Sequence, residues 1–207
     1  MSTEVKSNNE AKPNHDQHLF LIAIPIGIGM NLAIGTLVSI LKLPVFLDAI
    51  GTITVTLLLG IRAGITTGVL SFLIGGLLVN PAMPYFVGTQ AAIALYTGLV
   101  AKRGLFKSWP RCLLAGIGLG VVAATVSAPI IVWLFGGITG SGSGFITAFL
   151  LASGKSVIKS VFLTGVACEP VDKAVQSVIA LWLTRSLPKK IRTVFAAHSS
   201  ENFDRNI

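Results

Sequence analysis

The chain has 207 residues, of which 53% are hydrophobic and only 12% are charged, and its formal net charge is +8. Because soluble domains carry about 25% charged residues, this composition excludes an ordinary soluble domain and predicts a membrane protein. The basic excess is compatible with a nucleic-acid partner, but most lysines and arginines fall at the ends of apolar runs, where membrane topology explains them better.

Six apolar runs lie between a polar tail at 1–18 and a basic tail at 188–207. The predicted spans are 19–41, 45–59, 61–79, 85–101, 112–135 and 156–183. Crossing the hydrocarbon takes about 17–25 residues, so the short second run is predicted to be tilted or partly re-entrant. The first run is too long for the apolar core of a signal peptide and indicates a retained helix. We therefore expect an all-α polytopic membrane protein, a six-transmembrane-helix bundle over residues 19–187.

The basic residues predict the orientation of this bundle. With both termini in the cytoplasm, most of the 16 lysines and arginines fall in the tails or in inside loops, as the positive-inside rule requires. The exceptions are Lys42, Lys155, Lys159 and Lys173. The opposite orientation places most basic residues outside, so we expect both termini to be cytoplasmic.

Small residues recur at intervals of four along several predicted helices. They are Gly29 and Ala33 in the first span, Gly60, Gly64 and Gly68 around the third, and Gly116, Gly120, Ala124 and Ala128 in the fifth. In lipid this spacing lets helix backbones approach closely. Packing within the chain is the simpler interpretation, and packing against a partner is the alternative.

The segment 135–160, FGGITGSGSGFITAFLLASGKSVIKS, contains features of two kinds of active site. GKS is not the end of a Walker A loop, because that motif needs glycine where this chain has Phe149. A nucleophilic Ser141 or Ser143 would need a base, and the histidines, His15, His18 and His198, all lie in or near the tails. A buried lysine is the remaining candidate base. We expect residues 136–154 to form an outer loop that acts as a lid.

Charged residues follow one side of the sixth span. On a helix, Lys155, Lys159, Glu169, Lys173 and Gln176 fall within one stripe, which we expect to face the bundle interior. Charges at membrane depth are costly and are normally paired or functional. Glu169, Asp172 and Lys173 therefore form either a coupling or binding element or an internal ion cluster. Lys155 and Lys159 near the outer end either contact a ligand or extend to the membrane interface.

Three further polar residues are predicted near the outer side of the bundle: Asp48, Asn80 and Gln90. Asp48 stands at the start of the second span, where it can cap the helix or face a ligand. The cysteines, Cys112 and Cys168, have no zinc-ligand or CxxC spacing, so neither a metal site nor a disulfide framework is expected.

Four stretches in order, FLDAIGT, LLLGIRAGITTGVLSFLIGGLLVNP, FGGITGSGSG and ACEPVDKAVQSVIALWLTRSLPKK, resemble the substrate-binding S components of energy-coupling factor (ECF) transporters. The resemblance covers nearly the whole chain apart from the tails. It implies a multi-pass subunit of a prokaryotic cytoplasmic membrane that captures a vitamin or related micronutrient from outside. Its expected partners are a transmembrane coupling subunit and two cytoplasmic ATPase subunits. Docking would use small residues of the first helix, here Gly29 and Ala33.

The resemblance implies a ligand held between helices under the outer loops. The residues expected to bind it are Asp48, Asn80, Gln90, Thr139, Ser141, Lys155 and Lys159. We expect no catalytic activity, ATP site or cofactor in this chain. The main alternative is a stand-alone secondary transporter or channel that uses Glu169, Asp172 and Lys173 as a proton or ion relay. An integral-membrane enzyme built on Ser141 is a third class.

Overall fold

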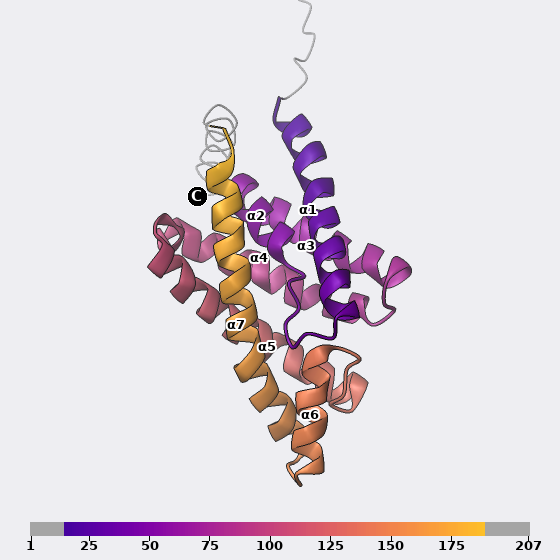
Figure 1. The fold of residues 1–207 in the computed structure, drawn as a ribbon. Helices are drawn as coiled ribbons and strands as arrows, with labels where there is room; N and C mark the ends of the chain where they lie inside the picture. The colour runs from indigo at the N-terminus through magenta and orange to yellow at the C-terminus, as the bar shows by residue number, and fades with distance from the viewer. Residues whose placement is uncertain (1–14, 189–207) are drawn as a thin grey trace, which may run out of the picture.

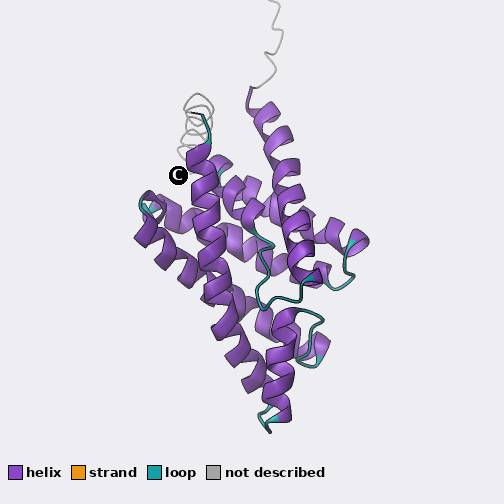
Figure 2. Cartoon of the chain, in the orientation of Figure 1, coloured by secondary structure: helices purple, strands orange, loops and turns teal. Residues whose placement is uncertain are grey.

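The structure is a computed structural model that describes residues 15–188, so most of both predicted tails lies outside the described residues. Every regular element in this range is helical, which confirms the all-α prediction for it (Figures 1 and 2). The α-helices are α1 (His15–Ile40), α2 (Ile50–Leu59), α3 (Ile61–Leu78), α4 (Val87–Lys102), α5 (Trp109–Phe135), α6 (Gly142–Ala152) and α7 (Val157–Ser186). Two short 3-10 helices, η1 (Met83–Phe86) and η2 (Leu105–Lys107), precede α4 and α5.

Three of these helices are long and apolar enough to cross a membrane: Leu21–Ile40 within α1, Ile61–Leu78 and Trp109–Phe135. Large apolar side chains lie on the outside of the bundle, among them Leu77, Trp133 and Phe149. Such surfaces are unfavourable in water and are expected where helices face lipid. Both observations support a membrane protein.

Close packing between α5 and α7 uses small residues of α5. A Cβ atom added at Gly116 would lie 2.5 Å from Ala174 Cα and 2.9 Å from the Lys173 carbonyl oxygen in α7. One added at Gly120 would overlap the backbone at Pro170. Glycine is therefore required where α5 and α7 cross. The small-residue face predicted in α5 packs within the chain.

The small residues of α3 also pack within the chain. A Cβ atom at Gly64 would overlap the Thr56 hydroxyl of α2, and one at Gly68 would lie 3.0 Å from Gln90 Cβ of α4. Gly60, with φ of +88°, forms the turn between α2 and α3.

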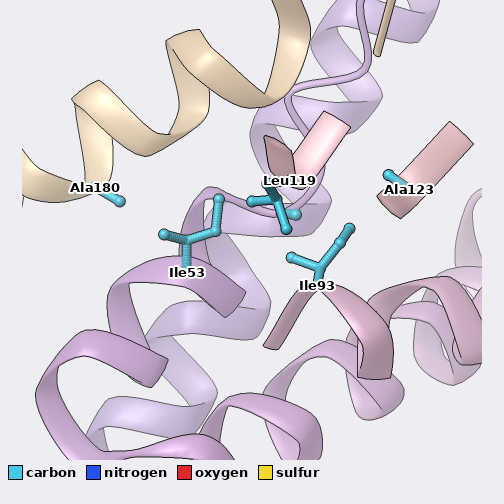
Figure 3. Close-up of a cluster of buried hydrophobic side chains, with 6 residues drawn as sticks. Ile53, Ile93, Leu119, Ala123 and Ala180 are labelled. Atoms are coloured by element: carbon cyan, nitrogen blue, oxygen red, sulfur yellow. The ribbon is translucent and has the colours of Figure 1, made fainter. Parts of the chain in front are cut away.

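The apolar core lies where four helices converge. Ile53 of α2, Ile93 of α4, Leu119 of α5 and Ala180 of α7 are at most 1% exposed and pack together with Ala49 and Ala123 (Figure 3). In lipid, such side chains stabilise the bundle through close van der Waals packing rather than through transfer from water. This core holds α2, α4, α5 and α7 in place around the polar residues described below.

The helix termini and connections gather at two opposite ends of the bundle. The start of α1 and the end of α7 lie at one end, and the α1–α2 connection, the α5–α6 loop and α6 lie toward the other (Figure 1). The segment 136–154, expected to be a loop, contains α6 as a helix. Thr147 of α6 donates a hydrogen bond to Thr164 of α7 over 3.0 Å, so α6 is packed along α7.

The second predicted span, 45–59, is helical only in part. Helix α2 begins at Ile50, and residues 45–49 are not helical. The backbone N–H groups of Phe46 and Leu47 both donate to Asp172 of α7, over 2.9 and 3.0 Å, and Leu47 has φ of +49°. A residue in this left-handed region cannot continue a right-handed helix, so the side chain of Asp172 replaces helical hydrogen bonds here.

Candidate ligand-binding site

A cavity of about 420 Å³ lies in the end of the bundle opposite the start of α1 and the end of α7. Its walls come from α1, α3, α4, α5 and α7, and its mouth is formed by the α1–α2 connection, residues 79–83 and the α5–α6 loop. Ligand pockets in proteins typically measure about 300–1,000 Å³. The cavity is therefore large enough for a small organic molecule.

Five of the seven residues predicted to bind a ligand line this cavity. They are Asp48, Asn80, Gln90, Thr139 and Ser141. Glu169 and Lys173 of the predicted ionic cluster line it too. The tertiary structure thus brings together residues from five separate segments of the chain, although their binding role stays a prediction.

Lys155 and Lys159 lie elsewhere, contrary to the predicted inward stripe. Lys155 precedes α7, Lys159 is in its first turn, and both side chains are exposed. Only the later part of the stripe, Glu169, Lys173 and Gln176, is buried. The start of α7 is covered on one side only: Val157 lies against Gly137 of the α5–α6 loop, and α6 lies beside α7 (Figure 1), whereas Lys155 and Lys159 lie on the uncovered side. The interfacial interpretation of the two lysines fits this position better than ligand contact.

A hydrogen-bonded network of polar groups, centred on Asn31 of α1, backs the cavity wall, which Asn31 and Gln90 line. The amide nitrogen of Asn31 donates to the hydroxyls of Thr52 and Ser71 over 2.9 and 3.0 Å. Its amide oxygen accepts from the N–H of Gly51 at the start of α2 over 2.7 Å. Thr52 in turn donates to Gln90 of α4 over 2.9 Å. These bonds tie α1, α2, α3 and α4 together and orient the polar groups of the cavity.

One lysine lies among three carboxylates on the α7 side of the cavity. Lys173 Nζ is 2.6 Å from Asp172 Oδ2, 3.3 Å from Asp48 Oδ1 and 3.5 Å from Glu169 Oε2. The ammonium group is also 5.6 Å from the ring centre of Phe46. The predicted cluster of Glu169, Asp172 and Lys173 is thus a real assembly, and Asp48 joins it from the α1–α2 connection.

The three carboxylates of this cluster have different surroundings. Asp172 is fully buried and accepts from Phe46 N, Leu47 N, Lys173 and the Gln176 amide. Both its oxygens are therefore satisfied, and it holds the α1–α2 connection against α7. Asp48 and Glu169 line the cavity, and Glu169 Oε2 accepts no hydrogen bond from any described residue. Asp172 is structural, whereas Asp48 and Glu169 face the cavity.

The mouth of the cavity closes where two connections meet. Lys42 Nζ donates to the carbonyl oxygen of Gly140 over 3.1 Å. A Cβ atom added at Gly142 would overlap the carbonyl of Leu43 and lie 2.5 Å from that of Lys42. The α1–α2 connection and the α5–α6 loop are therefore in direct backbone contact. Of the expected lid, residues 139–142 line the cavity, whereas the rest of α6 does not.

Ser141 and Ser143, the serines considered as nucleophiles, share a hydrogen bond, and Ser141 also bonds to Thr139. Thr139 and Ser141 Oγ atoms are 2.7 Å apart, and those of Ser141 and Ser143 are 3.0 Å apart. No base is among the hydrogen-bond partners of Ser141 in the described part of the chain. Within residues 15–188, no group of histidine, cysteine and acidic side chains has a metal-binding arrangement.

Apolar and aromatic side chains make up much of the remaining cavity wall. Phe86 and Phe135 stack with ring centres 5.8 Å apart, and Phe46 and Phe72 also line the cavity. Aromatic walls with a few convergent polar groups are typical of sites for small organic ligands.

Sequence reasoning missed several polar residues of the cavity, among them Asn31 and Thr89. Asn31 was detectable, because an asparagine inside a long apolar span is costly unless it has partners. Thr89, whose buried hydroxyl has no hydrogen-bond partner within residues 15–188, gave no such signal. Threonine is common in helices that face lipid or protein alike.

Comparisons with protein-family models, curated proteins and solved structures gave no match to this chain.

Proposed function

We propose that the protein is a membrane-embedded substrate-capture subunit of an ATP-driven importer of the ECF type, which takes up a vitamin or a related micronutrient. The observation that carries this proposal is the cavity at the end of the bundle opposite the start of α1 and the end of α7. Two connections in backbone contact line its edge, and polar side chains meet an aromatic wall inside it. This arrangement suits capture and release of a small organic molecule.

The proposed topology has six spans with both termini in the cytoplasm, so that the cavity opens outside. Helix α7 counts as a span because its buried charges face other side chains inside the bundle. Helix α2 has 10 residues, which cover about 15 Å of a hydrocarbon layer about 30 Å thick. We therefore assign the second crossing to α2 together with residues 45–49, whose backbone is satisfied by α7.

A partner surface is proposed on α1. Gly29 and Ala33 are exposed, and nothing lies within 4 Å of a Cβ atom added at Gly29. Small exposed residues one turn apart let a second helix approach closely, which fits a coupling subunit. Hydrolysis of ATP would belong to two cytoplasmic ATPase subunits, in line with the absence of a Walker motif from the sequence.

The test has two parts. Purified protein in lipid nanodiscs is screened by calorimetry against vitamins and their precursors, and affinity-tagged protein is isolated from its native membrane to identify copurifying subunits. We expect one compound to bind tightly and a coupling subunit to copurify. Gly29→Leu should abolish the copurification without altering ligand affinity, whereas Thr125→Leu, on an exposed face of α5, should leave it intact. Absence of both a ligand and a coupling subunit would refute the proposal.

The alternative function is a stand-alone secondary transporter or channel. The observation that favours it is the buried carboxylate of Glu169, which lines the cavity and accepts no hydrogen bond from the described residues through Oε2. Such groups act as proton carriers in membrane transporters. Proton-driven uptake by liposomes that contain this protein alone, abolished in Glu169→Gln, would establish the alternative and displace the importer subunit.

A further inference from the structure

The cavity holds more acidic than basic side chains. Lys173 is the only basic residue that lines it in the described part of the chain, and Asp48 and Glu169 line it as well. Asp172 lies directly behind them, 2.6 Å from the lysine. With its carboxylates ionised, the cluster carries three negative charges and one positive charge.

The hydrogen bonds show which carboxylates the lysine satisfies. Asp172 has the shortest contact to Lys173 and accepts three further hydrogen bonds, two of them from backbone N–H groups. Asp48 accepts a longer hydrogen bond from Lys173, over 3.3 Å. The side chain of Glu169 is 10% exposed, and its Oε2 faces Lys173 at 3.5 Å but accepts no hydrogen bond from residues 15–188. An incompletely satisfied carboxylate that lines a cavity is unfavourable unless a cation or another donor completes it.

Other parts of the wall suit an organic cation. The ring of Phe46 lies beside the charge cluster, as its 5.6 Å distance to Lys173 Nζ shows. Aromatic faces attract cations, and Phe72, Phe86 and Phe135 offer further apolar surface for the body of a ligand. Thr89 adds a buried hydroxyl that has no partner among the described residues. An inorganic ion would leave most of the 420 Å³ cavity unfilled.

We propose that the ligand of this cavity is an organic cation, with a protonated amine, an amidine or an N-alkylated heteroaromatic ring placed at Asp48 and Glu169 and an apolar or aromatic body against the phenylalanines. This inference rests on the proposed capture function and specifies its substrate class. Two lysines in a binding site would have favoured a ligand with a carboxylate or phosphate. Lys155 and Lys159 lie outside the cavity, so they do not set the charge of its ligand.

The test compares three probes that share one aromatic body and differ in charge. Phenethylamine is cationic, phenethyl alcohol is neutral and hydrocinnamate is anionic. Binding of each to the full-length protein in nanodiscs of neutral lipid is measured by calorimetry. We expect phenethylamine to bind roughly tenfold or more tightly than the alcohol, as charge-assisted hydrogen bonds do, and hydrocinnamate to bind more weakly than both.

Variants then locate the cation. Asp48→Asn and Glu169→Gln should each reduce the affinity for phenethylamine by about tenfold. Their affinity for phenethyl alcohol should stay unchanged, which shows that the cavity is still formed. Glu169→Asp, which keeps the charge, should retain the preference for the amine.

The outcomes distinguish this inference from the function on which it rests. Equal binding of amine and alcohol, as expected if bound protons neutralise the excess charge, would overturn the cationic class. Tighter binding of hydrocinnamate would also overturn the cationic class, but it would still be consistent with the capture function. If none of the probes binds, the cationic class is overturned, and the capture function falls with it only when no coupling subunit copurifies.

Discussion

The contact between the two connections at the mouth predicts that Gly142→Ala opens the cavity. The methyl group would overlap the carbonyl of Leu43 and lie 2.5 Å from that of Lys42, whereas ordinary contacts begin at 3.4 Å. The α5–α6 loop must therefore move away from the α1–α2 connection by about 1 Å or more, and overpacking of this kind costs about 1–3 kcal/mol. This free energy lowers the stability of the closed mouth relative to the open one.

A control is available two residues away. Gly140 lies in the same loop, but nothing lies within 4 Å of a Cβ atom added there, and its φ is not in the left-handed region. Gly140→Ala changes the loop by the same methyl group and leaves the hydrogen bond from Lys42 to its backbone oxygen available. We expect Gly140→Ala to behave like the wild-type protein.

Hydrogen exchange followed by mass spectrometry in nanodiscs measures the opening directly. The amide N–H of Leu43 donates to Val38, and that of Gly144 donates to Ser141. A loss of about 1–3 kcal/mol in the closed state should accelerate exchange at such amides by roughly 5- to 150-fold. Peptides from α5 should be unaffected. Equal exchange in Gly142→Ala, Gly140→Ala and the wild type would show that the contact does not hold the mouth closed.

Three further substitutions test the packing and the polar network by thermal unfolding in detergent. Lys173→Met leaves three carboxylates without their common cation, and breaking a buried ion cluster costs about 3–5 kcal/mol; an unchanged Tm would mean that the carboxylates are already neutral. Asn31→Leu removes the hydrogen bonds of the Asn31 amide group and leaves backbone N–H groups in the first turn of α2 without their acceptor. The free energy of unfolding should fall by about 1–3 kcal/mol, and a rise in Tm would contradict this role. Gly120→Ala should lower Tm because its Cβ overlaps Pro170 of α7, whereas Gly29→Ala, which meets nothing within 4 Å, should not; equal values in the two would show that the α5–α7 crossing is free to adjust.

Sequence reasoning succeeded where a property depends on neighbours along the chain. The ends of α3, α5 and α7 lie within a few residues of the predicted ends, because apolar runs interrupted by glycine, proline and charge mark helices locally. The packing role of Gly116 and Gly120 was likewise readable, since small residues at intervals of four form one flat helix face. The three helices that are long and apolar enough to cross a membrane were all among the predicted spans.

The same reasoning failed where distant segments interact. The stripe from Lys155 to Gln176 was predicted from the period of one helix, but that period does not show how far the bundle extends beside α7. The first part of α7 is covered on one side only, so Lys159 is exposed whereas Lys173 is buried. Residues 45–49 were placed at the start of a predicted span because the run is mostly apolar. Asp172, more than a hundred residues away, accepts hydrogen bonds from the backbone of this segment and holds it in a non-helical conformation.

By itself the sequence determined the class of this protein, because an apolar composition and long apolar runs allow only backbone structures that satisfy their own hydrogen bonds in lipid. It also determined which polar residues would be costly and therefore in need of partners. Only the tertiary structure decided who those partners are. Asp48 and Lys173, 125 positions apart, meet because α2 and α7 pack across the core, and Asp48 thereby adds a second carboxylate beside Glu169 on a cavity wall with one lysine.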